Sequence, residues 1–220
     1  MKPNIYTPAR KTITRSHKGF RSKVPSKKMK MTVMCESLLE AQFARLVEVH
    51  PMVAEYYYQP TEEWYYDDLG NRLTCFPDFK VVWRNGSWTY FEVKPDAKLK
   101  CPDLRAKLEL ISKNFEARSI NYRVITDKEL EEPVRGEILK GLHKINRLSI
   151  PPARLSQILS HEDLSKSRTL GNLTKLFGEA DALKLVAGGH FFVLFDARLD
   201  QGSRVYHQLE EVQNHDSFRI

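Results

Sequence analysis

The stretch from Leu73 to Lys94 constrains the fold of this chain more than any other. It reads LTCFPDFKVVWRNGSWTYFEVK. Residues 73–83 alternate in polarity and are rich in Phe, Val and Trp, which favours a β-strand. Asn85-Gly86 is the dipeptide most typical of a two-residue hairpin turn. Residues 87–94 are therefore predicted to return as the second strand of a β-hairpin.

Three charged side chains in this hairpin indicate a candidate catalytic site. Asp78 lies early in it, and Glu92 and Lys94 lie near its end, where side chains two residues apart project to the same face. Two carboxylates beside an ammonium suit metal-dependent phosphodiester hydrolysis, because hard divalent cations prefer carboxylate oxygens. Asp78 and Glu92 are the predicted ligands of one or two Mg²⁺ or Mn²⁺ ions, and Lys94 is expected to neutralise charge on the phosphate. The plainer alternative is a hairpin with solvated charges.

A helix is predicted upstream, over residues 35–49, with an apolar stripe that includes Leu39 and Phe43. Glu36 and Glu40 lie one turn apart on a neighbouring face of this helix. Either carboxylate could complete the hairpin site, and spacing alone does not choose between them. An ordinary solvated helix face is the alternative.

Four short motifs, in this order, resemble TnsA, the endonuclease family of heteromeric Tn7-like bacterial transposases. They are Glu36-Ser37-Leu38-Leu39-Glu40, Gln59-Pro60, Phe76-Pro77-Asp78-Phe79 and Glu92-Val93-Lys94-Pro95. The third and fourth motifs also resemble the PD-(D/E)xK signature of restriction-endonuclease-like nucleases. This resemblance implies an α/β fold with a mixed β-sheet core flanked by helices. It also selects Glu40 as the helix carboxylate, with Glu36 as the fallback.

The resemblance implies a metal-dependent DNA endonuclease that hydrolyses the non-transferred 5′ strand at transposon ends. The implied partners are transposon-end DNA, a TnsB-like transposase and a TnsC-like ATPase regulator. The implied catalytic residues are Glu40, Asp78, Glu92 and Lys94, with the three carboxylates as Mg²⁺ or Mn²⁺ ligands. A resolvase or restriction-type nuclease is the alternative among enzymes. A non-catalytic DNA-binding adaptor with a nuclease-like fold is the alternative outside them.

The charge of the chain favours an acidic partner. Its formal net charge is +7, and residues 1–31 hold ten Lys or Arg and no acidic residue. We expect a flexible basic arm over residues 1–31 that binds DNA phosphates, with a solubilising tail as the alternative. The candidate DNA-binding side chains are Lys11, Arg15, Lys18, Arg21, Lys23, Lys27 and Lys28 in the arm, and Lys98 after the hairpin.

Two domains are expected after this arm, because Pro151-Pro152 marks a boundary near residue 149. The predicted nuclease domain spans residues 32–148, and its helix over 102–118 and strand over 120–126 imply a parallel pairing with the hairpin. Residues 149–220 predict three short helices and then two strands, which resembles a small winged-helix domain. Because its third helix is poor in basic residues, we expect this domain to dock a protein partner rather than to read DNA.

Several other classes are excluded or disfavoured by the sequence. No apolar run of about 18 residues predicts a membrane span, and no glycine-rich phosphate loop predicts nucleotide hydrolysis. The three cysteines lack metal-ligand spacing and cannot all pair with one another. We therefore expect a protein of the bacterial cytoplasm, associated with the nucleoid when it acts.

Overall fold

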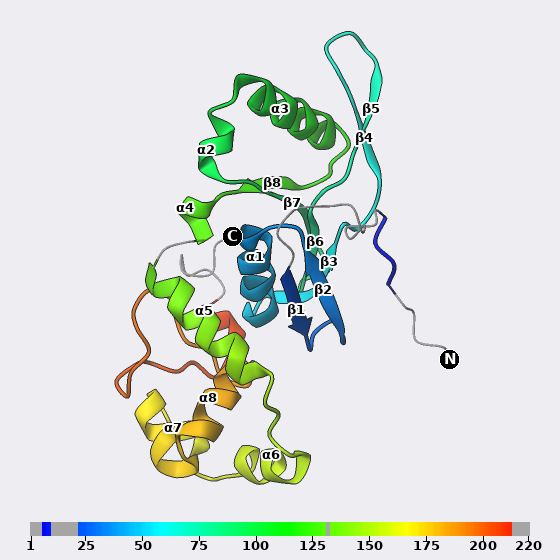
Figure 1. Ribbon diagram of the computed structural model, residues 1–220. Helices are drawn as coiled ribbons and strands as arrows, with labels where there is room; N and C mark the ends of the chain where they lie inside the picture. Colours follow the sequence, from blue (N-terminus) through cyan, green and yellow to red (C-terminus); the bar gives the residue numbers. More distant parts are fainter. Residues whose placement is uncertain (1–5, 10–21, 131–132, 213–220) are drawn as a thin grey trace, which may run out of the picture. The chain divides into compact units, whose positions relative to one another are not determined.

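The computed structural model describes residues 6–9, 22–130 and 133–212 (Figure 1). The chain divides into two compact units, Met1–Ala44 with Val53–Leu130, and Arg45–Met52 with Glu131–Ile220. The sequence predicted the second boundary at 148/149, whereas the structure assigns residues 131–148 to unit 2. The physical reason is packing, since helix α5 (Pro133–Asn146) lies against helix α8 (Glu179–Ala187).

Unit 1 is built on a mixed four-stranded sheet in the order β3-β6-β7-β8. Pairs β3/β6 and β6/β7 are antiparallel, and β7/β8 is parallel, as the sequence predicted for the strand after the crossover helix. Gly86, at φ 84°, lies in the turn between β6 and β7, where a residue without a Cβ is favoured. The four strands are β3 (Val53–Tyr58), β6 (Phe79–Trp83), β7 (Trp88–Val93) and β8 (Tyr122–Ile125).

Helix α1 (Leu38–Val49) covers one face of this sheet. The Phe43 ring lies 5.0 Å from the Phe79 ring and 4.9 Å from the Phe91 ring, measured between centroids. Phe43 and Phe91 are fully buried and Phe79 is nearly so. This is the apolar stripe that the helical spacing predicted.

The crossover helix α3 (Pro102–Ala117) covers the opposite face. Its Phe115 ring lies 5.9 Å from the Tyr90 ring and 5.3 Å from the Tyr122 ring. Tyr90 and Phe91 are neighbours on one strand and so point to opposite faces. A mixed sheet with a helix on each face agrees with the predicted restriction-endonuclease-like core. Two short helices flank the crossover, α2 (Asp96–Leu99) before α3 and α4 (Asp127–Leu130) after β8.

Two hairpins add to this core. Strands β1 (Ser22–Ser26) and β2 (Met31–Cys35) pair antiparallel and bury Val24 and Val33. The expectation of a flexible arm through residue 31 is therefore wrong from Ser22 onward. Strands β4 (Glu63–Tyr66) and β5 (Arg72–Cys75) form the second hairpin, which projects from the sheet in Figure 1.

Unit 2 contains the three short helices that the sequence predicted after residue 149. The two predicted strands, 191–195 and 204–209, are reduced to isolated bridges, which pair Thr169 with Arg204 and Phe192 with Tyr206. A winged-helix domain therefore stays a prediction. The remaining elements are α6 (Pro152–Leu159), η1 (Leu164–Lys166), α7 (Leu170–Phe177) and η2 (Leu209–Glu211).

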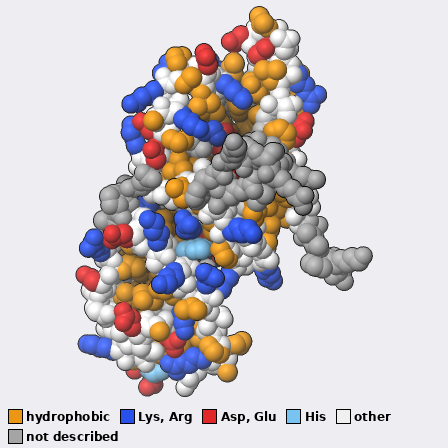
Figure 2. Space-filling view, viewed as in Figure 1, with side chains coloured by type: hydrophobic (Ala, Val, Ile, Leu, Met, Phe, Trp, Pro, Cys, Tyr) orange, Lys and Arg blue, Asp and Glu red, His pale blue; other side chains and the backbone are white. Residues whose placement is uncertain are grey.

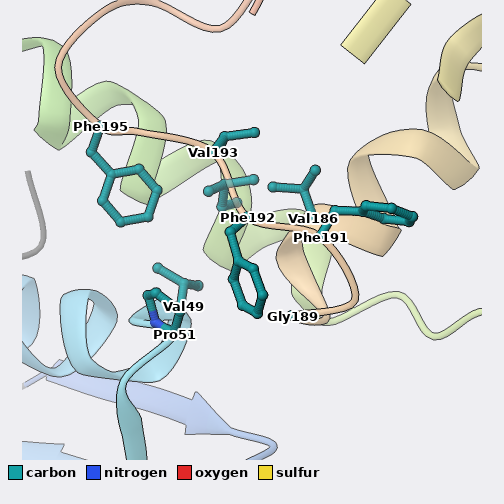
Figure 3. Close-up of a pocket in the computed structure, with 9 residues that line it drawn as sticks. Val49, Pro51, Val186, Gly189, Phe191, Phe192, Val193 and Phe195 are labelled. Atoms are coloured by element: carbon teal, nitrogen blue, oxygen red, sulfur yellow. The ribbon is translucent and has the colours of Figure 1, made fainter. Parts of the chain in front are cut away.

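An apolar pocket in unit 2 lies among Val49, Pro51, Val186 and the segment 189–195 (Figure 3). Its volume of about 20 Å³ offers room for roughly one water molecule. Because the lining is apolar, such a water would lack the polar partners that hold buried water in place. We therefore regard the pocket as a packing feature. Within the described residues, no helix is long and apolar enough to span a lipid bilayer.

Candidate active site

The central hairpin brings Asp78 to the end of strand β7. Phe79 pairs with Phe91 in the antiparallel ladder, so the residue before Phe79 lies beside the last residues of β7. The Asp78 Oδ2 atom accepts a hydrogen bond of 2.9 Å from the Val93 backbone N–H. Only 7% of Asp78 is exposed to solvent. The turn and the strand pairing thus fix this carboxylate in one place.

Lys94 joins the two predicted carboxylate ligands. Its Nζ lies 3.1 Å from Asp78 Oδ2 and 2.6 Å from Glu92 Oε1. The Lys94 backbone N–H donates to the Ile125 carbonyl of the parallel strand at 3.1 Å, which holds the main chain in the sheet. Asp78, Glu92 and Lys94 therefore share one small patch, as their spacing predicted.

The patch places two carboxylates beside one ammonium, so its negative charge is only partly balanced. Burial, reinforced by the charge of Asp78, raises the pKa of Glu92 to about 7, despite the contact with Lys94. Burial alone would lower the pKa of Lys94, but the charges of Asp78 and Glu92 raise it above its usual value. Lys94 is thus held firmly protonated between two carboxylates, of which one ionises only near neutral pH.

Glu40 lies in the first turn of α1 and caps that helix. Its Oε2 accepts from the Glu36 backbone N–H at 2.8 Å, and its Oε1 accepts from the Ser37 hydroxyl at 2.9 Å. The Glu40 N–H in turn donates to Ser37 Oγ at 3.0 Å. Ser37-x-x-Glu40 is the sequence signature of a capping box, but here the Glu40 carboxylate accepts from the Glu36 N–H and the Ser37 hydroxyl in place of the Ser37 N–H.

Glu40 also interacts electrostatically with the hairpin site. Burial raises the pKa of Glu40, and the charge of Asp78 raises it further. The charge of Asp78 therefore reaches Glu40, although no contact between the two carboxylates is present among the described residues. Across the described part of the chain, however, no three His, Cys, Asp or Glu side chains are grouped to hold a metal ion. Glu40 therefore stays a predicted ligand.

The donor set of the patch suits a hard divalent cation. Asp78 and Glu92 converge on the same ammonium, and both offer the oxygen ligands that Mg²⁺ and Mn²⁺ prefer. A divalent cation at these carboxylates would also offset the negative charge that raises the pKa of Glu92. Asp78 and Glu92 are thus the residues that would hold such an ion.

Two further residues at the site were given no role there by sequence analysis. Gln59 is buried, and its Nε2 lies 3.5 Å from Asp78 Oδ1. Tyr122 on β8 has a buried hydroxyl for which no described residue supplies a hydrogen-bond partner. Its pKa is raised by burial and then by the charges of Glu92 and Asp78. Gln59 belongs to the Gln59-Pro60 motif of the TnsA resemblance, which was its one sequence signal, whereas no short-range signal points to Tyr122. Strand pairing brings both residues to the site from distant parts of the sequence.

The candidate DNA-binding cations fall into three groups. Lys23 and Lys27 are exposed on the β1–β2 hairpin, where Lys28 is half-buried, and Lys98 is exposed on α2. Lys107 on α3, which sequence analysis did not select, lowers the pKa of Glu92 through its charge. Figure 2 shows Lys and Arg side chains spread over the drawn face with acidic side chains between them. The other candidates, Lys11, Arg15, Lys18 and Arg21, lie outside the described residues.

Comparison with known protein families finds a match to the region of the chain that contains the candidate site. The family model of the TnsA-like endonuclease N-terminal domain matches residues 50–127. This range includes Asp78, Glu92 and Lys94 and all four strands of the central sheet. The resemblance to TnsA-like endonucleases is confirmed over these residues. No curated protein sequence matches the chain.

Proposed function

From the TnsA-like endonuclease N-terminal domain over residues 50–127, we propose that this chain is a metal-dependent DNA endonuclease of a transposition complex. The observation that supports it most is the largely shielded patch in which Lys94 Nζ contacts both Asp78, which is buried, and Glu92, which is half-buried. All three residues lie inside the matched range. A nuclease-like adaptor without activity has no need for two carboxylates on one ammonium in a site largely shielded from solvent, because removing charges from water is costly.

Asp78 and Glu92 hold Mg²⁺ or Mn²⁺ in this proposal, with Glu40 as a third carboxylate on the Asp78 side. When bound, the cation polarises the scissile phosphate and lowers the pKa of an attacking water. The Val93 N–H fixes the Asp78 carboxylate through a bond of 2.9 Å, so the ligand is oriented before the cation arrives.

Lys94 supplies the positive charge that the reaction requires beside the metal. Its raised pKa keeps the ammonium protonated at neutral pH. With a cation held at Asp78 and Glu92, the Lys94 ammonium would be available to pair with the phosphate. There it stabilises the negative charge that develops as the phosphodiester bond is cleaved.

We propose that unit 2 docks a protein partner and that the non-transferred 5′ strand at transposon ends is the substrate. Most of unit 2 lies outside the matched residues. Helix α8 begins with Glu179 and Asp181, and Asp181 pairs with Arg154 at 3.1 Å, which leaves this helix poorly suited to phosphate contact. A TnsB-like transposase and a TnsC-like ATPase are the proposed partners.

The test is to map the cut strand on end-labelled DNA that carries or lacks transposon ends. Each DNA is incubated with Mg²⁺ and the full chain, with and without a TnsB-like transposase. We expect nicks in the 5′ strand at the ends, and only when the transposase is present. End-specific cutting by the chain alone would show that recognition of the ends resides in this protein. Cutting of the 3′ strand would contradict the strand assignment.

A further inference from the structure

Gln59, at the end of strand β3, is locked in place by backbone and side-chain contacts around Asp78. Its backbone φ is 46°, which few non-glycine residues adopt. The Gln59 N–H donates to the Asp78 carbonyl at 2.8 Å. The Gln59 carbonyl accepts from the Ala9 N–H at 2.9 Å and from the Tyr6 hydroxyl at 3.1 Å. The surrounding structure therefore enforces an unfavourable backbone conformation at this residue.

This conformation directs the Gln59 side chain to Asp78. Gln59 is 2% exposed, and its Nε2 lies 3.5 Å from Asp78 Oδ1, at the outer limit of hydrogen-bond distance. The opposite orientation of the amide would place two acceptors face to face, so the nitrogen belongs on the carboxylate side. The other carboxylate oxygen, Oδ2, already accepts from the Val93 N–H and from Lys94. Gln59 Nε2 therefore contacts Oδ1, the carboxylate oxygen that neither Val93 nor Lys94 contacts.

The other end of the amide lacks a partner in the part of the chain that the structure describes. Gln59 Oε1 is buried and accepts no hydrogen bond from any described residue. Buried amide oxygens almost always find a donor, so the missing donor is expected to be a water molecule or a ligand. Mg²⁺ retains several waters when it binds one or two carboxylates, and such waters are hydrogen-bond donors. The orphaned oxygen lies on the same side chain that contacts the proposed metal ligand.

We infer that Gln59 is a positioning residue, which orients the Asp78 carboxylate through Nε2 and accepts a hydrogen bond from a cation-bound water through Oε1. The inference rests on the proposed metal-dependent function. Partners of this kind, which contact a ligand rather than the ion, commonly change metal affinity about 10- to 100-fold. Gln59 thereby tunes how tightly the site holds its ion without binding the ion itself.

Two variants of the full chain test whether the Gln59 amide group, and its reach to Asp78, are needed for cation binding. Gln59→Met retains the length of the side chain and removes both amide atoms. Gln59→Asn retains an amide and tolerates the left-handed backbone, but it is one methylene too short to reach Asp78. Binding of Ca²⁺ in the absence of DNA, so that no turnover occurs, is measured by calorimetry for each. Thermal unfolding without metal shows whether each variant folds.

We expect both variants to bind Ca²⁺ about tenfold more weakly than the wild type, with similar metal-free unfolding midpoints. Wild-type affinity in folded Gln59→Met protein would overturn the inference. A second measurement needs neither metal nor a Gln59 variant. The Gln59 side-chain amide signal in a ¹H–¹⁵N spectrum should shift in Asp78→Asn, and an unchanged signal would also overturn the inference. If the wild type binds no divalent cation at all, the proposed function fails, while the amide signal still decides the contact between Gln59 and Asp78.

Discussion

Glu92 Oε1 lies 2.6 Å from the Lys94 ammonium, and yet the pKa of Glu92 is raised to about 7. Burial and the nearby Asp78 charge outweigh this favourable contact. The Lys94 ammonium is shared with Asp78, so one cation serves two carboxylates. A carboxyl whose pKa is raised despite a contact with an ammonium is typical of a functional site, and a bound cation would lower that pKa.

The pH dependence of stability follows from Glu92. A pKa raised from 4.5 to about 7 in the folded state stabilises the metal-free protein below pH 4.5, and this stability is lost as pH rises through about 7. The loss amounts to at most about 3 kcal/mol. Denaturant unfolding of the wild type and Glu92→Gln between pH 4 and 8 measures it. The difference between the two proteins should change over this range, and a constant difference would contradict the raised pKa.

Cation binding should displace a proton near neutral pH. Glu92 has to ionise before it can hold a metal, and at pH 6 most of the protein carries it protonated if the pKa is about 7. Calorimetry with Ca²⁺ in two buffers of different ionisation enthalpy counts the released protons. We expect nearly one proton at pH 6 and almost none at pH 8.5. Equal proton release at both pH values would show that Glu92 is not a ligand.

Lys94→Met should separate metal binding from catalysis. The ammonium competes with a cation for Asp78 and Glu92, so its removal should leave Ca²⁺ affinity at pH 8.5 equal to or higher than that of the wild type. Cleavage should nevertheless fall strongly, because no charge remains to stabilise the phosphate. Lys113→Met on α3 is the matched control, because this side chain is exposed and has been given no role in the site or in DNA binding, and it should retain activity. Loss of Ca²⁺ binding in Lys94→Met would contradict the proposed role.

Neutralising the basic segment should flatten the salt dependence of DNA binding. The quadruple Gln variant of Lys11, Arg15, Lys18 and Arg21 is preferable to deletion of residues 1–31, which would also remove strand β1 and buried Val24. The slope of log K against log salt should fall by about 0.9 for each DNA phosphate that the variant no longer neutralises.

A control with equal charge change replaces Lys140, Lys144, Arg147 and Lys175 of unit 2 by Gln. If unit 2 docks protein rather than DNA, this control should keep the wild-type slope. An unchanged slope in the first variant would leave the N-terminal segment without a role in DNA binding.

The hairpin and its three charged residues could be predicted because their signals are local. The Asn85-Gly86 turn sets the register, and the register places Asp78 beside Glu92 and Lys94. The role of Gln59 could not be predicted in the same way, because its contact with Asp78 spans 19 residues and depends on the pairing of β3 with β6.

Two other differences have equally specific causes. The β1–β2 hairpin was missed because Lys-rich composition masks the buried Val24 and Val33, and because Pro25 is unusual within a strand. The predicted boundary at 148/149 differs from the division into units, because α5 resembles an extension of the preceding domain in sequence and only its packing against α8 places it in unit 2.

The central claim is that Asp78, Glu92 and Lys94 form the active site of a metal-dependent nuclease. Its most direct test is cleavage of transposon-end DNA by wild-type and Asp78→Asn protein, each with the transposase and with either Mg²⁺ or EDTA. Asparagine retains the shape of Asp78 but removes the charge that binds a cation. We predict Mg²⁺-dependent nicking by the wild type and none by Asp78→Asn, with equal DNA binding and a folded variant. Nicking by Asp78→Asn at the wild-type rate, or nicking by the wild type in EDTA, would contradict the account.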